Sequence, residues 1–225
     1  NAYGVLRGSG NPFKYYRDGV ALEINPSAGE CRAYHWDDNK LALATVKMQV
    51  LNEHPDVRIT AVPVAKLTAK QMDTFPDDCK ILGCKPTLDA YKEKQKEVNV
   101  DPMKLRWRSS GAHLHLSFEQ EQPIENWGPI IKLADLLIGV PFTYIFGDKD
   151  EFKRRTLYGQ AGEFRFQRYG FDKDCQKELT GLEYRVLSSR LFNHPGIWSL
   201  FSGIWKFVIG QHYDTLWASW DKGME

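Results

Sequence analysis

Four segments of this chain combine an ordinary apolar strand face with an opposite face rich in groups that can bind metals or phosphates. Residues i and i+2 of a strand point the same way, so alternation defines each face. The polar positions are Glu23 and Asn25, His113 and His115, Glu163, Arg165 and Gln167, and Glu183 and Arg185. Lysine and threonine, which are usual on a merely solvated sheet face, are nearly absent from these positions.

If the four strands form one sheet, its polar face gathers carboxylates, imidazoles and guanidiniums. Carboxylate and imidazole together bind divalent metals, and guanidiniums neutralise phosphates. The combination is typical of a metal–nucleotide phosphoryl-transfer site. Each strand alone has a plainer interpretation, since Glu-x-Arg is typical of a cross-strand ion pair. Arg154 and Arg155, taken alone, indicate only surface charge. The coincidence of four such strands favours the functional interpretation.

Expected strands and helices are interspersed without a regular βαβ alternation, which predicts an α+β fold with a mainly antiparallel sheet. A length of 225 residues suits a single domain spanning residues 1–225. Alternation predicts strands at 18–26, 57–67, 110–118, 162–170 and 180–189. Helical periodicity and proline or glycine stops predict helices at 41–54, 87–98, 125–139 and 196–213.

The overall charge excludes some partners. Net charge is +1, which argues against a broad electrostatic surface for nucleic acid or an acidic membrane. The apolar stretch at 196–210 is too short to span a bilayer and contains Lys206. The four cysteines include "CKILGC", which is not a zinc spacing, so we expect free thiols in a reducing compartment.

The motifs also resemble a known family. "SGAHLHLSF" resembles the Gly-x-Gly-Met-His-x-His-x-Ser-Leu strand of glutamine synthetases, with Ser110 at the first glycine, and "TGLEYRVLSS" resembles their late Glu-x-Arg strand. Five segments in order look more closely like the phage-type carboxylate–amine ligase (amidoligase) family of the glutamine synthetase and glutamate–cysteine ligase superfamily. They are "DGVALEINP", "LGCKPTLDAY", "SSGAHLHLSF", "RRTLYGQAGEFRFQRYG" and "GLEYRVLSS", spanning about Asp18 to Pro195.

The resemblance implies a curved, mainly antiparallel sheet of the glutamine synthetase catalytic type with flanking helices. It also implies an ATP-dependent ligase that uses Mg²⁺ or Mn²⁺ and joins a carboxylate to an amine through an acyl phosphate. By position it implies metal ligands at Glu23, His113 and Glu183, nucleotide contacts at His115 and Arg155, catalytic arginines at Arg165 and Arg185, and substrate contacts at Asn25 and Gln167.

The implied partners are small molecules or peptides that carry a carboxylate and an amine, with no nucleic acid and no membrane. The expected location is cytoplasmic, in the host cell if the protein is phage-encoded, and virion association is a further expectation. The sequence does not identify the two substrates or the oligomeric state.

One departure from the family pattern opens alternatives. The family begins with a Gly-x-Asp-x-Glu strand, and "NAYGVLRGSGNPFKYYRDG" has no such motif. Either that strand precedes Asn1 or the chain lacks it, and a metal would then have too few ligands. The first alternative is therefore an inactive ligase-fold phage structural or binding protein. The second is a cupin-like metal protein, because His113, His115 and Glu119 fit a His-x-His-x-x-x-Glu spacing and His194 could supply a later histidine.

Overall fold

The structure is a computed structural model, and it describes residues 4–7, 12–26, 32–82, 87–96, 100–118, 127–172 and 177–210. The chain divides into two compact units. Unit 1 comprises 1–61, 66–84 and 100–108, and unit 2 comprises 62–65, 85–99 and 109–225. The strand pairings are antiparallel and helices accompany both units, so the expected α+β class with antiparallel sheets is confirmed.

Unit 1 is built on a three-stranded sheet in the order β1-β2-β3, with β1 Gly4–Arg7, β2 Pro12–Asp18 and β3 Ala21–Asn25. A two-residue turn with φ +59° at Gly19 joins β2 to β3, and glycine adopts this backbone conformation at little cost. The long helix α1, Arg32–Glu53, packs on this sheet. Its buried Ala42 and Val46 are four residues apart and meet Phe13 of β2.

Two short helices and a small sheet follow α1 in the chain. Helix α2, Ala69–Thr74, begins with a capping box made by Thr68 and Gln71, and α3 spans Asp77–Lys80. The two-stranded sheet pairs β4 Val64–Lys66 with β7 Trp107–Ser109. Arg108 is buried and donates to the carbonyls of Lys80, Pro102, Leu105 and Trp107.

Unit 2 contains a five-stranded sheet in the order β6-β5-β9-β10-β8. Its strands are β5 Thr87–Asp89, β6 Lys92–Lys96, β8 Leu114–Phe118, β9 Glu163–Asp172 and β10 Lys177–Tyr184. The two long strands β9 and β10 form a hairpin at its centre. Three strands with the expected polar face, β8, β9 and β10, are therefore direct neighbours.

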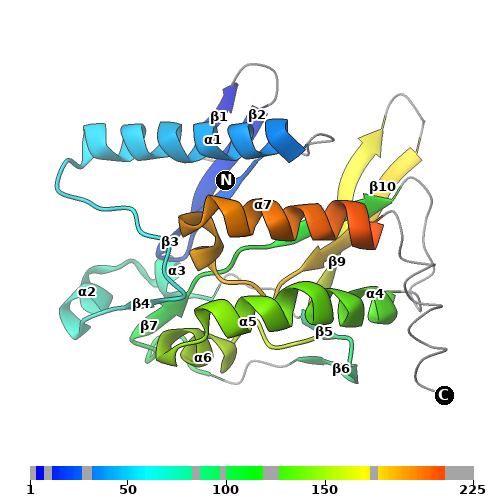
Figure 1. Cartoon of the computed structure of the whole chain (residues 1–225). Helices are drawn as coiled ribbons and strands as arrows, with labels where there is room; N and C mark the ends of the chain where they lie inside the picture. The colour runs from blue at the N-terminus through cyan, green and yellow to red at the C-terminus, as the bar shows by residue number, and fades with distance from the viewer. Residues whose placement is uncertain are drawn as a thin grey trace. The chain divides into compact units, whose positions relative to one another are not determined.

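Two helical segments cover one face of this sheet (Figure 1). The first runs from α4 Trp127–Ala134 through the π-helical η2 Asp135–Gly139 into α5 Val140–Phe146. The second runs from α7 Pro195–Gly203 into the π-helical η4 Ile204–Ile209. Trp127 stacks on Phe166 at a ring-centroid distance of 5.0 Å, and Tyr184 stacks on Trp205 at 5.5 Å. Two further elements, α6 Lys149–Arg155 and the 3-10 helix η3 Ser189–Asn193, complete the unit.

Several expected elements differ in the structure. The helix expected at 41–54 begins earlier, at Arg32, and the strands expected at 110–118 and 180–189 become β8 and β10. Where a helix was expected at 87–98, the described residues 87–96 form β5 and β6, which pair with each other, and β5 also pairs with β9. The expected strand at 57–67 shrinks to β4. The helix expected to end at Gly139 continues to Phe146, and Pro141 lies in the first turn of α5, where its missing N–H breaks no helical bond.

One helical segment, Trp127–Phe146, is long and apolar enough to cross a membrane by length and composition. Half of its 18-residue window is buried inside the structure, and a core helix of this kind passes the same test. The segment is therefore only weak evidence of a membrane span.

Among the cysteines in the described residues, Cys79 is a buried free thiol, whereas Cys31, Cys84 and Cys175 fall outside those residues.

Candidate functional site

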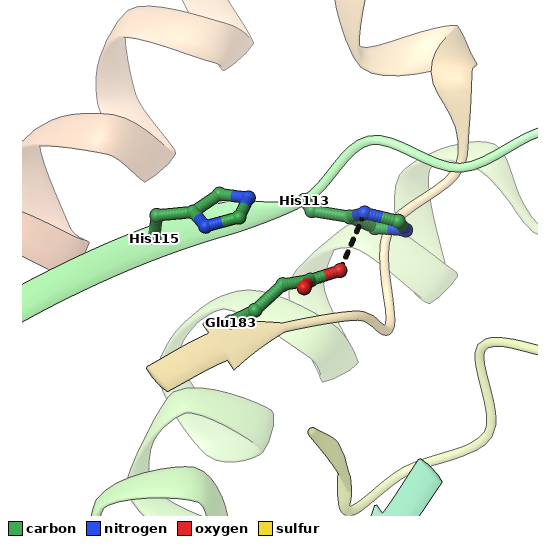
Figure 2. Close-up of side chains that lie close together, drawn as sticks. All are labelled: His113, His115 and Glu183. Atoms are coloured by element: carbon green, nitrogen blue, oxygen red, sulfur yellow. Dashed lines mark ion pairs between the residues drawn. The ribbon is translucent and has the colours of Figure 1, made fainter. Parts of the chain in front are cut away.

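Three side chains with metal-ligating atoms meet in unit 2: His113, His115 and Glu183. One ligand atom from each lies within 4.8 Å of the others. Figure 2 shows the three side chains close together, with an ion pair between His113 and Glu183. His113 lies just before β8, His115 lies within β8, and Glu183 lies near the end of β10. The antiparallel register of β8 and β10 places His115 directly opposite Glu183. The pairing of these two strands therefore brings the cluster together.

Glu183 is the centre of this cluster. Its side chain is 1% exposed, and Arg165, its direct partner on β9, donates to Oε2 from Nε at 3.0 Å and from Nη2 at 2.7 Å. Gln167 also donates to Oε2. The second oxygen, Oε1, lies 2.8 Å from His113 Nδ1 and 3.3 Å from Arg185 Nε. A buried carboxylate is tolerated here because cationic and polar groups surround it.

The protonation of these groups follows from their surroundings. Burial by itself would raise the pKa of Glu183, but the adjacent His113 and Arg185 outweigh this effect and hold the pKa below its ordinary value. The His115 side chain meets solvent, yet partial loss of hydration lowers its pKa, against the opposing effect of Glu183. At neutral pH the site therefore presents an ionised carboxylate and a neutral His115 imidazole, the forms that ligate metals.

The donor set also fits a divalent cation. Glu183 Oε1 is buried, and the groups beside it are His113 Nδ1 at 2.8 Å and Arg185 Nε at 3.3 Å. Two imidazoles and one carboxylate suit Mn²⁺ or Zn²⁺ better than Mg²⁺, which prefers oxygen ligands. Ligand atoms about 2.0–2.2 Å from one tetrahedral ion lie roughly 3.3–3.6 Å apart. The ligand atoms of the cluster lie within 4.8 Å of one another, so they would draw closer together to bind one ion.

Arg185 and Arg165 contact the same carboxylate but differ in exposure. Arg165 is 27% exposed, whereas Arg185 is 4% exposed and also approaches Thr87 Oγ1 at 3.5 Å. Of the two guanidiniums, that of Arg165 is therefore the more accessible to an incoming anion.

Two of the expected site residues lie in unit 1. Glu23 and Asn25 belong to β3, which pairs with β2 in the three-stranded sheet. The expectation that Glu23 shares one sheet with His113 and Glu183 is therefore wrong. The physical reason is the short hairpin turn at Gly19, which pairs β3 with its immediate neighbour in sequence. There Tyr16 donates its hydroxyl to Glu23 and accepts from Asn25 Nδ2 at 2.9 Å.

Arg155 lies in unit 2 and contacts groups outside the cluster. Its Nε lies 3.6 Å from Glu151 Oε1, and it lines a cavity of about 380 Å³ together with Asp135, Thr143 and Val186. Val186 follows Tyr184 on the helix-covered side of the sheet, close to Gly139. The role expected for Arg155 at the nucleotide remains a proposal.

Two buried charged groups of unit 2 were missed by sequence reasoning. Arg154, expected to be surface charge, is 1% exposed and donates to four backbone carbonyls. Asp135 is 3% exposed and accepts from Tyr184 and from the amide of Gly162. An aspartate within an apolar helical pattern was the only sequence signal for Asp135, and Arg154 gave none.

Comparisons with known proteins returned no relatives: no family model matches the chain, and no curated protein or solved structure matches it.

Proposed function

We propose that this protein is an ATP-dependent carboxylate–amine ligase of the phage amidoligase type, with its metal centre at His113, His115 and Glu183. The observation that carries the proposal is the convergence of these three ligand groups with Arg165 on one sheet face. We further propose that the five-stranded sheet of unit 2 corresponds to the curved catalytic sheet of the glutamine synthetase superfamily. The five ordered sequence motifs support that correspondence.

The proposed chemistry requires two displacements. A substrate carboxylate oxygen attacks the terminal phosphorus of ATP and ADP departs; an amine nitrogen then attacks the acyl carbon, phosphate departs, and the amine loses a proton. Both steps bring anionic groups together, so positive charge must neutralise them. A bound divalent ion would supply part of this charge and polarise the phosphoryl oxygens.

The side chains of the cluster have distinct parts in this proposal. Glu183 and the two imidazoles would hold the ion, and the partly exposed Arg165 would contact the transferring phosphoryl group. Arg185, which is buried against Glu183 and Thr87, would orient the carboxylate rather than meet the substrate. Gln167 donates to Glu183, so its role would also be to orient that carboxylate. The donor set favours Mn²⁺ over Mg²⁺.

The main alternative is a ligase-like fold without catalytic activity. It is favoured by the number of protein partners that Glu183 already has, since a carboxylate held by Arg165, Gln167 and His113 can stabilise a sheet without any metal.

The cupin alternative is less well supported, because the sheets of the described residues form open strand orders rather than a barrel. His194 precedes α7, with its ring 4.9 Å from Phe146, and Glu119 falls outside the described residues.

Calorimetric titration of Mn²⁺, Mg²⁺ and ATP tests the proposal. The ligase predicts Mn²⁺ binding at the cluster, ATP binding that requires the ion, and phosphate release that requires both a carboxylate and an amine. The control variant is Glu23→Gln, which removes a carboxylate from the other sheet. If the parent protein binds neither Mn²⁺ nor ATP, the proposed activity is wrong and the structural alternative stands.

A further inference from the structure

The segments that carry His113 and Glu183 do not form a regular ladder where the two residues meet. Leu114 pairs with Tyr184, and the next paired positions are Gly111 and Ser188. The chain therefore advances three residues on one side and four on the other, which is the count of a β-bulge. A bulge redirects side chains and takes backbone groups out of the ladder. The Ala112 amide still donates to the Leu187 carbonyl at 3.0 Å across it, and further support at this point would come from side chains.

The side chain of Arg154 lies at this bulge. Its Nε donates to Ser110 at 3.0 Å, Nη1 donates to Val186 at 2.8 Å, and Nη2 donates to Arg185 at 3.2 Å and Leu187 at 2.7 Å. Three of these carbonyls belong to the residues that follow Glu183, and the fourth lies three residues before His113. One rigid fork of donors thus joins both segments of the cluster.

The environment of Arg154 is specific for a guanidinium. Burial lowers its pKa only to about 10, so the side chain stays charged at neutral pH. Gly159 has a φ of +84°, and a Cβ atom there would lie 1.8 Å from Arg154 Nη1. The loop after α6 therefore has no side chain at the place where the guanidinium lies. A lysine ammonium is a single point with three donors and cannot reach four carbonyls spread over two segments.

We infer that Arg154 is a positioning residue for the metal cluster: it fixes the bulged segments so that His113 and Glu183 face each other at ligand distance. This inference rests on the proposed metal centre for its functional meaning, but its geometric part concerns only the His113–Glu183 contact. Residues that orient metal ligands typically change metal affinity by about 10–100-fold when replaced.

A matched control exists in unit 1. Arg108 is also buried, and it also donates to four carbonyls, those of Lys80, Pro102, Leu105 and Trp107. Arg154→Lys and Arg108→Lys therefore remove the same kind of interaction, one beside the cluster and one in the other unit. Comparable losses of urea stability are expected from both.

The two variants should differ in the spectrum of His113. Two-dimensional NMR of the imidazole nitrogens reports the contact between His113 Nδ1 and Glu183. Arg154→Lys should shift these resonances and weaken Mn²⁺ binding at least tenfold, whereas Arg108→Lys should leave both unchanged. Parental His113 resonances in a folded Arg154→Lys variant, or equal shifts in both variants, would overturn the inference.

The inference can still be tested if the parent protein binds no Mn²⁺ or if Arg154→Lys does not fold. If the parent binds no Mn²⁺, the proposed metal centre fails, but the His113 resonances still decide whether Arg154 positions the histidine. If Arg154→Lys does not fold, Gly159→Ala displaces the guanidinium without removing it. A folded Gly159→Ala variant should show the same His113 shift, and unchanged His113 resonances would overturn the inference.

Discussion

Glu23 and Glu183 lie on antiparallel strands of two different sheets, and the sequence around each suggested the same role. Glu23 is partly exposed and is bonded to the hydroxyl of Tyr16. Glu183 is fully buried and contacts a histidine and two arginines. A buried carboxylate enclosed by cations can stay ionised with little contact with water. The difference shows that the partners across the sheet, and not the strand motif, set the charge around each glutamate.

The largest effect should follow from replacing Glu183 with glutamine. The change leaves Arg165 and Arg185 without their anionic partner in a buried position, so the free energy of unfolding should fall by roughly 3–5 kcal/mol. Mn²⁺ binding should be lost. Urea unfolding and calorimetry measure the two effects. Parental stability in this variant would contradict the central position of Glu183.

The two histidines should give the next largest effect. His113→Ala and His115→Ala each remove one of three ligand groups, and each should weaken Mn²⁺ binding by at least about tenfold. Thermal melts should show a smaller loss of stability than Glu183→Gln, because both rings are partly or largely solvent-accessible. Unchanged Mn²⁺ affinity in His115→Ala alone would favour the nucleotide contact that the sequence suggested for His115.

A moderate effect is expected at the helix-covered side of β10. Burial raises the pKa of Asp135 above its ordinary value, against the hydrogen bonds from Tyr184 and Gly162. The folded protein therefore binds this proton more tightly than the unfolded chain, and its contribution to stability falls as pH rises through the folded pKa. Asp135→Asn should remove this dependence. The difference in urea midpoint between parent and variant, followed from pH 4 to pH 8, should shift in favour of the variant as pH rises; a constant difference would contradict the assignment.

The smallest effect should come from Glu23→Gln, the counterpart of the first variant. Glutamine can still accept the hydroxyl of Tyr16, so the stability change should stay within about 1 kcal/mol. Mn²⁺ binding by the cluster should be unchanged, since the three ligand groups of the proposed centre all come from unit 2. A loss of Mn²⁺ binding measured by calorimetry would bring Glu23 back as a metal ligand and would weaken the contrast between the two glutamates.

Patterns of short range were predictable from the sequence. The alternation of β8, β9 and β10 defined which side chains share a face, because the period of two is a property of each strand alone. The α+β class followed from the order of the elements. The helix expected at 87–98 failed because β9 offers Leu88 and Asp89 a pairing partner, and tertiary pairing outweighs the helical preference of a charged segment.

The sequence alone determined that carboxylate, imidazole and guanidinium groups are available. It also identified the pair His113 and His115 and the strand that carries Glu183. Only the tertiary structure decided that β3 pairs within its own hairpin and leaves the sheet of the cluster. It also decided that Arg154 is buried at the bulge while its neighbour Arg155 lines a cavity. The physical reason is that neighbouring identical residues have the same local propensity, and their burial depends on which distant segments pack around each of them.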